Sequence, residues 1–115
     1  MRESIVKQKS YDFALQIVET SRYLVNRREY ILSKQLLRSG TAIGALIREA
    51  EFGQSKADFV HKLSISLKEA NETDYWLSLL HDTGYLSGAE YQDLNNKCQE
   101  IIRILAASVK TLKED

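Results

Sequence analysis

The sequence predicts an all-α protein, an antiparallel up-down-up-down four-helix bundle that forms a single domain over residues 1–115. Three observations predict this fold class. The 115 residues include no proline, where ordinary usage would give about six, and proline breaks helix interiors. Apolar residues recur at steps of three and four along four long segments. The three joints between these segments are short, so consecutive helices should be antiparallel neighbours.

The first two helices are expected over residues 4–26 and 30–51, with a short polar joint at residues 27–29. The first helix carries a broad apolar face, made by Phe13, Ala14, Ile17, Val18, Leu24 and Val25. The second helix carries a buried stripe, made by Leu36, Leu37, Ile43, Leu46, Ile47 and Ala50. Each face has the width that a bundle helix turns toward the core.

The third helix is expected over residues 56–82, and the fourth follows Ser87 and runs to about residue 112. Gly53 can take the left-handed conformation that ends a helix, and Ser55 is a good N-cap. Ser87 followed by Glu90 is a capping-box pattern. The main stripe of the third helix consists of Phe59, Val60, Leu63, Leu67, Ala70, Leu77 and Leu80. That of the fourth consists of Tyr91, Leu94, Cys98, Ile101, Leu105, Ser108 and Leu112.

Composition narrows the possible function classes. Sixteen basic residues balance sixteen acidic ones, whereas nucleic-acid-binding domains normally show a basic excess. Residues 1–52 carry nine basic and six acidic residues, a net of +3, and residues 53–115 carry seven and ten, a net of −3. The single cysteine rules out an internal disulfide and suggests a reducing compartment. No apolar signal core or membrane-length apolar run is present, so a soluble cytoplasmic protein without a membrane partner is expected.

Gly40 and Gly44 lie inside the second helix, although each glycine there costs about 1 kcal/mol relative to alanine. A helix that accepts two of them gains from the close approach of another backbone. Two explanations are open. The pair accommodates a bulky neighbour within one bundle, such as Trp76, or it forms part of a contact between subunits.

The third helix carries a second, partly polar face beside its main stripe. Its members follow one another at steps of three and four, and they are Ile65, Glu69, Glu72, Trp76 and Leu79. A helix of a monomeric bundle should bury one stripe and solvate the rest. The face therefore predicts a contact between subunits, with a solvated acidic face as the alternative.

One side of the second helix also suits close docking, because small residues lie there between one charge of each sign. That side consists of Arg38, Ala42, Ala45 and Glu49. Arg38 suits a charge pair with a glutamate of the third helix, although the sequence does not say which one. The predicted subunit interface consists of Arg38, Gly40, Gly44, Glu49, Ile65, Glu69, Glu72 and Trp76.

Basic residues gather loosely around the first joint. They are Arg22, Arg27, Arg28 and Lys34. The simplest interpretation is a solvated helix end. In a ring of subunits the cluster would be repeated as a positive belt, and the alternative interpretation is therefore a weak contact to RNA or DNA phosphates.

Residues that carry catalysis or hold metals in other proteins are not arranged for it here. A di-metal carboxylate site in a bundle needs a Glu-x-x-His motif from each of two helices, and the nearest match is Asp58-x-x-His61. Cys98 lies on an apolar seam, where cysteine usually behaves as an inert small hydrophobe. No catalytic residue, metal ligand or cofactor is expected.

Several motifs resemble one family. They are Gln35-Leu36-Leu37-Arg38-Ser39-Gly40-Thr41-Ala42-Ile43-Gly44-Ala45, Glu49-Ala50, Asp58-Phe59, Lys62-Leu63, Leu67-Lys68-Glu69-Ala70 and Glu72-Thr73-x-Tyr75-Trp76-Leu77. Over about residues 5–112 the chain resembles the bacterial four-helix bundle proteins associated with 23S ribosomal RNA intervening sequences. The resemblance implies a homopentameric ring. None of the motif positions corresponds to a known catalytic residue.

A related branch of that family, the accessory proteins of diversity-generating retroelements, is basic, binds nucleic acid and works with a reverse transcriptase. This chain departs from the pattern in two ways. It is neutral, and Gly44-Ala45-Leu46-Ile47-Arg48-Glu49 stands where the family often has Gly-Ala-Asn-Ile-Ala-Glu. The sequence therefore predicts a non-enzymatic oligomeric scaffold or adaptor, with a nucleic-acid-binding accessory protein as the alternative.

Overall fold

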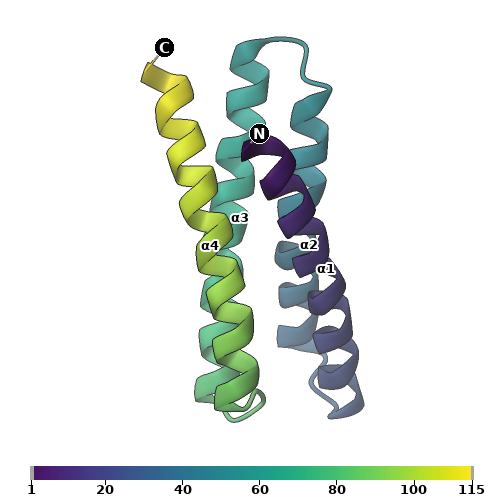
Figure 1. Ribbon diagram of the computed structural model, residues 1–115. Helices are drawn as coiled ribbons and strands as arrows, with labels where there is room; N and C mark the ends of the chain where they lie inside the picture. Colours follow the sequence, from purple (N-terminus) through teal and green to yellow (C-terminus); the bar gives the residue numbers. More distant parts are fainter. Residues whose placement is uncertain (1, 115) are drawn as a thin grey trace.

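The structure is a computed structural model that describes residues 2–114, and it consists of four helices. They are α1 (Arg2–Asn26), α2 (Ile31–Glu51), α3 (Lys56–Asp82) and α4 (Gly88–Glu114). Each helix packs on the next one along the chain, and α1 also packs on α4. The molecule measures 46 × 21 × 19 Å, and both termini lie at the same end of it (Figure 1). The predicted all-α fold with four helices is confirmed, and no strand occurs within residues 2–114.

Two of the predicted helix starts are confirmed by their caps. The Ser55 hydroxyl accepts a hydrogen bond from the backbone N–H of Asp58 at 3.1 Å. At the start of α4, the Ser87 hydroxyl accepts from the N–H of Glu90 at 3.1 Å, and the Glu90 carboxylate accepts from the N–H of Ser87 at 3.0 Å. This reciprocal pair is the capping box that the sequence predicts.

The expected left-handed helix end at Gly53 is wrong. Within the described residues, positive φ angles occur only at Arg28 (65°) and Gly84 (87°). The chain after α2 instead closes a tight turn, in which the N–H of Gly53 donates to the carbonyl of Ala50 at 3.0 Å. Such three-residue turns commonly end helices, and this one needs no left-handed residue.

The core runs the length of the bundle and draws on all four helices. Its largest fully buried apolar side chains are Phe13, Ile17, Leu24, Leu36, Ile43, Leu77, Leu80, Ile101 and Leu105. The expected burial of Val25 and Leu37 is wrong, because these side chains are 45% and 37% exposed. Both line the same shallow hollow on the outer side of α1 and α2, so the apolar face of the first two helices extends beyond the core.

Gly40 and Gly44 bring α2 close to α1. A Cβ atom at Gly40 would lie 2.8 Å from Cγ2 of Ile17, and one at Gly44 would lie 3.2 Å from Oγ of Ser10. No side chain fits at Gly40 unless Ile17 shifts. The close approach therefore lies within one chain, and the neighbouring helix is α1 rather than the helix that carries Trp76.

Candidate functional site

Exposed apolar side chains are concentrated on the first half of the molecule. Among the side chains that the structure describes, ten large hydrophobic ones are exposed, and nine of them lie between residues 5 and 52. The nine are Ile5, Tyr11, Leu15, Tyr23, Val25, Tyr30, Ile31, Leu37 and Phe52, and the tenth is Tyr75. Single exposed apolar residues are ordinary, and it is contiguous ones that mark an interaction site. Among the nine, Tyr11 and Phe52 border one hollow, and Val25 and Leu37 line another.

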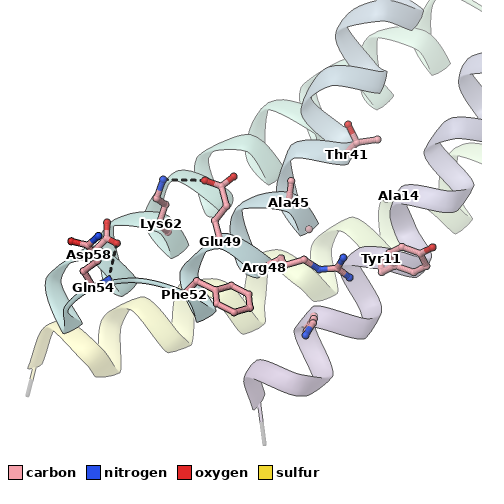
Figure 2. Close-up of a pocket in the computed structure, with 12 residues that line it drawn as sticks. Tyr11, Ala14, Thr41, Ala45, Arg48, Glu49, Phe52, Gln54, Asp58 and Lys62 are labelled. Atoms are coloured by element: carbon pink, nitrogen blue, oxygen red, sulfur yellow. Dashed lines mark hydrogen bonds and ion pairs between the residues drawn. The ribbon is translucent and has the colours of Figure 1, made fainter.

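An open groove of about 730 Å³ lies between α1 and α2 and reaches the start of α3. We call it the α1–α2 groove. Small residues line its middle, namely Ala14, Thr41, Gly44 and Ala45. Two aromatic rings border it, because Tyr11 of α1 is 51% exposed and Phe52 after α2 is 79% exposed. In Figure 2 the side chain of Arg48 lies between these rings and reaches toward α1.

Arg48 is the cation in this groove that has no partner. Lys7 pairs with Glu51 at 3.0 Å, and Lys62 pairs with Glu49 at 3.1 Å (Figure 2). No ion pair or hydrogen bond joins the Arg48 side chain to any residue of the range 5–114, whose side chains the structure describes. The groove therefore combines aromatic rings, small residues and one unpaired guanidinium group.

A second surface lies beside the groove, where α2 packs on α3, and we call it the α2–α3 seam. Arg38 of α2 forms ion pairs with two glutamates of α3, with Glu69 at 3.1 Å and with Glu72. The indole N–H of Trp76 donates to the Glu72 carboxylate at 2.9 Å. Behind this network, the buried Thr73 hydroxyl donates to the hydroxyl of Ser39 at 2.9 Å. The expected charge pair of Arg38 is thus found, and it involves both glutamates.

The structure brings four of the eight predicted interface residues together in the seam, and two others, Gly44 and Glu49, line the groove. Arg38, Glu69, Glu72 and Trp76 form the network of the seam, and Ile65 lies half-buried on the same helix. Glu49 pairs instead with Lys62. The two glycines face α1, as described above, so they lie on the groove side of α2.

The basic cluster at the first joint divides into two parts. The Arg27 guanidinium donates to the backbone carbonyl of Tyr85 at 2.8 Å and lies over the Tyr85 ring, 5.0 Å from its centroid. Arg27 therefore fastens the α1–α2 joint to the α3–α4 joint. Arg22, Arg28 and Lys34 are exposed, and their side chains have no partner among the described residues.

Two features that enzymes often use, a metal-binding cluster and a reactive thiol, are not found among the described residues. No group of three His, Cys, Asp or Glu residues among those whose side chains the structure describes could hold a metal ion. Burial raises the pKa of the Cys98 thiol to about 12, and its Sγ donates to the carbonyl of Ala70 at 3.3 Å. This thiol stays protonated at neutral pH and is a poor nucleophile. Within the same residues, no helix has both the length and the apolar character needed to cross a bilayer.

Sequence reasoning found only part of the groove: Gly44 and Glu49 line it, but three of its larger side chains were missed. Tyr11, Phe52 and Arg48 were not among the candidate interface residues, because each falls outside the stripes that helical spacing picks out. One signal was available. Arg48 stands where the resembling family often has a small residue, and an arginine at such a position changes the surface it faces.

Comparison with known proteins agrees with this fold. The chain is 52% identical to a solved protein with unknown function from the S23 ribosomal protein family of Bacteroides thetaiotaomicron VPI-5482, with a TM-score of 0.94. The similarity covers 96% of this chain and 99% of that one. No curated protein matches the chain. The family model of the 23S rRNA-intervening sequence protein matches residues 2–107, and the chain therefore belongs to the 23S rRNA-intervening sequence protein family.

Proposed function

We propose that this chain is a non-enzymatic scaffold, an up-down-up-down bundle that assembles with copies of itself into a homopentameric ring. The observation that carries the proposal is the α1–α2 groove, where Tyr11 and Phe52 are exposed around an unpaired Arg48. Tyrosine and arginine are enriched among the residues that contribute most to binding between proteins. A monomer would leave this apolar surface in water, whereas an assembly would bury it.

The chemistry of the remaining residues supports a role without catalysis. The only thiol is buried and protonated at neutral pH. Every buried side-chain nitrogen and oxygen of the described residues has a hydrogen-bond partner. The core of these residues therefore offers no unsatisfied polar side-chain atom that could bind a ligand. A free, reduced thiol also fits a protein that works in the cytoplasm.

The mass in solution tests the proposal. Sedimentation velocity or light scattering at micromolar concentration should give about five times 13.2 kDa, or 66 kDa. The measured mass should fall when the protein is diluted, because association follows mass action. A single species near 13.2 kDa at all concentrations up to about 100 μM would overturn the proposal. Subunits that associate with a dissociation constant above about 100 μM would be too weakly bound for a scaffold.

A second candidate function is binding of RNA or DNA by the ring. The supporting observation is that Arg22, Arg28 and Lys34 are exposed and unpaired around one joint, next to Tyr30, which is 60% exposed. Five copies would repeat this cluster as a belt, and phosphate contacts of this kind weaken steeply as salt rises.

A filter-binding or gel-shift assay tests this second candidate by measuring how much structured RNA the protein retains at low salt. Lys34→Gln should weaken retention and lower the slope against salt concentration by about one unit per copy that touches phosphate. Lys110→Gln is the matched control, because Lys110 is also exposed and lies on α4, away from the cluster. Equal retention by both variants, or no retention by the wild type at low salt, would remove this function.

A further inference from the structure

The α1–α2 groove and the α2–α3 seam flank the same helix but differ in chemistry. We infer that, in the assembly, the groove of one copy receives the α2–α3 seam of the next copy, in a head-to-tail contact. The inference rests on the proposed function, because it names the two surfaces that meet when copies of this chain associate.

Charge complementarity supports this pairing. The groove contributes Arg48, which has no partner within the described residues. On the seam, the two carboxylates of Glu69 and Glu72 share the single guanidinium of Arg38. The Glu72 side chain remains 33% exposed, so the seam network has one negative charge more than it has positive charges. Docking would place the Arg48 guanidinium against this extra carboxylate, and such charge pairing helps to fix the relative position of the two copies.

The side chains of the two surfaces are also of the types that anchor interfaces. The seam presents Trp76, which is half-buried, with the exposed ring of Tyr75 packed edge-on against it at 5.0 Å between centroids. The groove presents the exposed Tyr11 and Phe52 on either side of small residues. A tryptophan and a tyrosine that enter a hollow with a small-residue floor make a well-packed contact, and such contacts carry most of the binding energy of an interface.

Geometry connects this pairing with a closed ring. The groove and the seam lie on neighbouring sides of the bundle, since α2 packs on α1 at one side and on α3 at the other. Neighbouring sides of a four-helix bundle face directions about 90° apart. In a closed ring, the two contact directions of a subunit differ by about 90° for four copies and about 108° for five. Arg38 of the seam and Arg48 of the groove are ten residues apart along α2, which is about 15 Å, so each bundle must tilt relative to the ring axis for the ring to close. Pairing across opposite sides would instead give an open fibre.

A symmetric contact between two grooves is less favourable, because the charges of the two surfaces would then not be complementary. An isologous interface uses the same patch on both copies, so it would bring two unpaired Arg48 side chains into one buried contact. Like charges across an interface oppose association. The seam, which has the complementary charge, would then stay outside the contact.

Reciprocal variants test the pairing. Arg48→Glu reverses the charge in the groove, and it breaks no ion pair or hydrogen bond among the described residues. Trp76→Ala removes the large aromatic side chain of the seam. Each variant alone should lose the assembled mass and run near 13.2 kDa. Ile65→Glu, a second seam variant that leaves the Trp76–Glu72 hydrogen bond intact, should do the same. Arg103→Glu is the matched control, because Arg103 is exposed on α4 and lies on neither surface, and it should keep the wild-type mass.

Mixing then distinguishes head-to-tail pairing from the alternatives. The Arg48→Glu variant keeps an unchanged seam, and the Trp76→Ala variant keeps an unchanged groove. In an equimolar mixture, the seam of the first can therefore bind the groove of the second. This single contact should give a heterodimer of twice 13.2 kDa, or 26.4 kDa. Circular dichroism should show that all variants keep their helix content. If the wild type assembles while both seam variants keep its mass, or while the mixture gives no heterodimer, the inference is overturned and the proposed function stands. If the wild type itself is a monomer, the proposed function fails.

Discussion

The two helical hairpins of this bundle pack by different means. In the first, α1 and α2 approach closely because Gly40 and Gly44 leave room for Ile17 and Ser10. In the second, α3 and α4 are linked by polar side chains. Asn95 donates to Asp74 at 2.6 Å, and the ring of His81 stacks on that of Tyr91 at 4.7 Å between centroids.

The two hairpins also differ in how many large apolar side chains they expose on the surface. Two helices that lie close together have room between them only for small residues, so larger apolar side chains alongside, such as Tyr11 and Leu37, remain exposed. The second hairpin leaves only Tyr75 exposed among its large hydrophobic side chains within the described residues. Close backbone packing inside the chain and an apolar surface outside it therefore arise from the same pair of helices.

The largest expected effect comes from filling the gap between α1 and α2. Gly40→Ala should lower the free energy of unfolding by about 2 kcal/mol, because the added Cβ would overlap the branched side chain of Ile17 and force the helices apart. Gly44→Ala should change it less, since the nearest atom there is the Ser10 hydroxyl at 3.2 Å. Urea unfolding measures both.

Gly88→Ala is the matched control from the second hairpin. No atom lies within 4 Å of the position that a Cβ atom would take at Gly88. Alanine is a better helix former than glycine, by about 1 kcal/mol in a helix interior and by less at the first residue of a helix, where Gly88 lies. Gly88→Ala should therefore stabilise the protein modestly. If the Gly40→Ala variant were as stable as the Gly88→Ala variant, the close approach of α1 and α2 at Gly40 would not stabilise the first hairpin.

A smaller effect is expected at the link between the hairpins. Arg27→Ala should lower the free energy of unfolding by about 1 kcal/mol, because it removes the hydrogen bond to the Tyr85 carbonyl and the contact with its ring. Arg27→Lys should recover little of this loss, since an ammonium group lacks the planar, forked donors of a guanidinium. Thermal unfolding that is unchanged in Arg27→Ala would mean that the two joints are not coupled through this residue.

The smallest effect concerns a contact between α1 and α4. Hydrogen bonds from Gln16 and Lys97 lower the pKa of the Asp93 carboxyl. A lowered folded-state pKa gives a stabilisation that is present above the ordinary pKa of about 3.9 and is lost as pH falls through the folded value. Asp93→Asn should therefore be less stable than the wild type at pH 7, by at most about 0.5 kcal/mol because the site is exposed. The difference should vanish near pH 2, and a constant difference at both pH values would contradict this cause.

Much of the fold could be predicted from the sequence because local chemistry determines it. The capping box of Ser87 and Glu90 and the hydroxyl cap of Ser55 act within four residues, and both are confirmed. The end of α2 was harder to predict. A glycine that follows a helix permits a left-handed residue without requiring one, and the turn at Gly53 uses another solution.

The candidate surfaces could be predicted only in part. Helical spacing placed Arg38, Glu69, Glu72 and Trp76 on facing sides of two helices, and the structure joins them in one network. The same spacing expected Val25 and Leu37 in the core, because periodicity shows which residues share a face and not how far the neighbouring helix covers it. That coverage depends on the distance between helices, which Gly40 sets through a contact with Ile17.

The position of Trp76 has a practical consequence. It is the only tryptophan in the chain, and its half-buried indole lies on the seam with its N–H bound to Glu72. The molecule thus contains a natural fluorescent reporter at one surface, and its emission responds to how much water reaches that ring. A titration of concentration, followed by the emission wavelength alone, would record any event that covers the seam without a label or a change to the sequence.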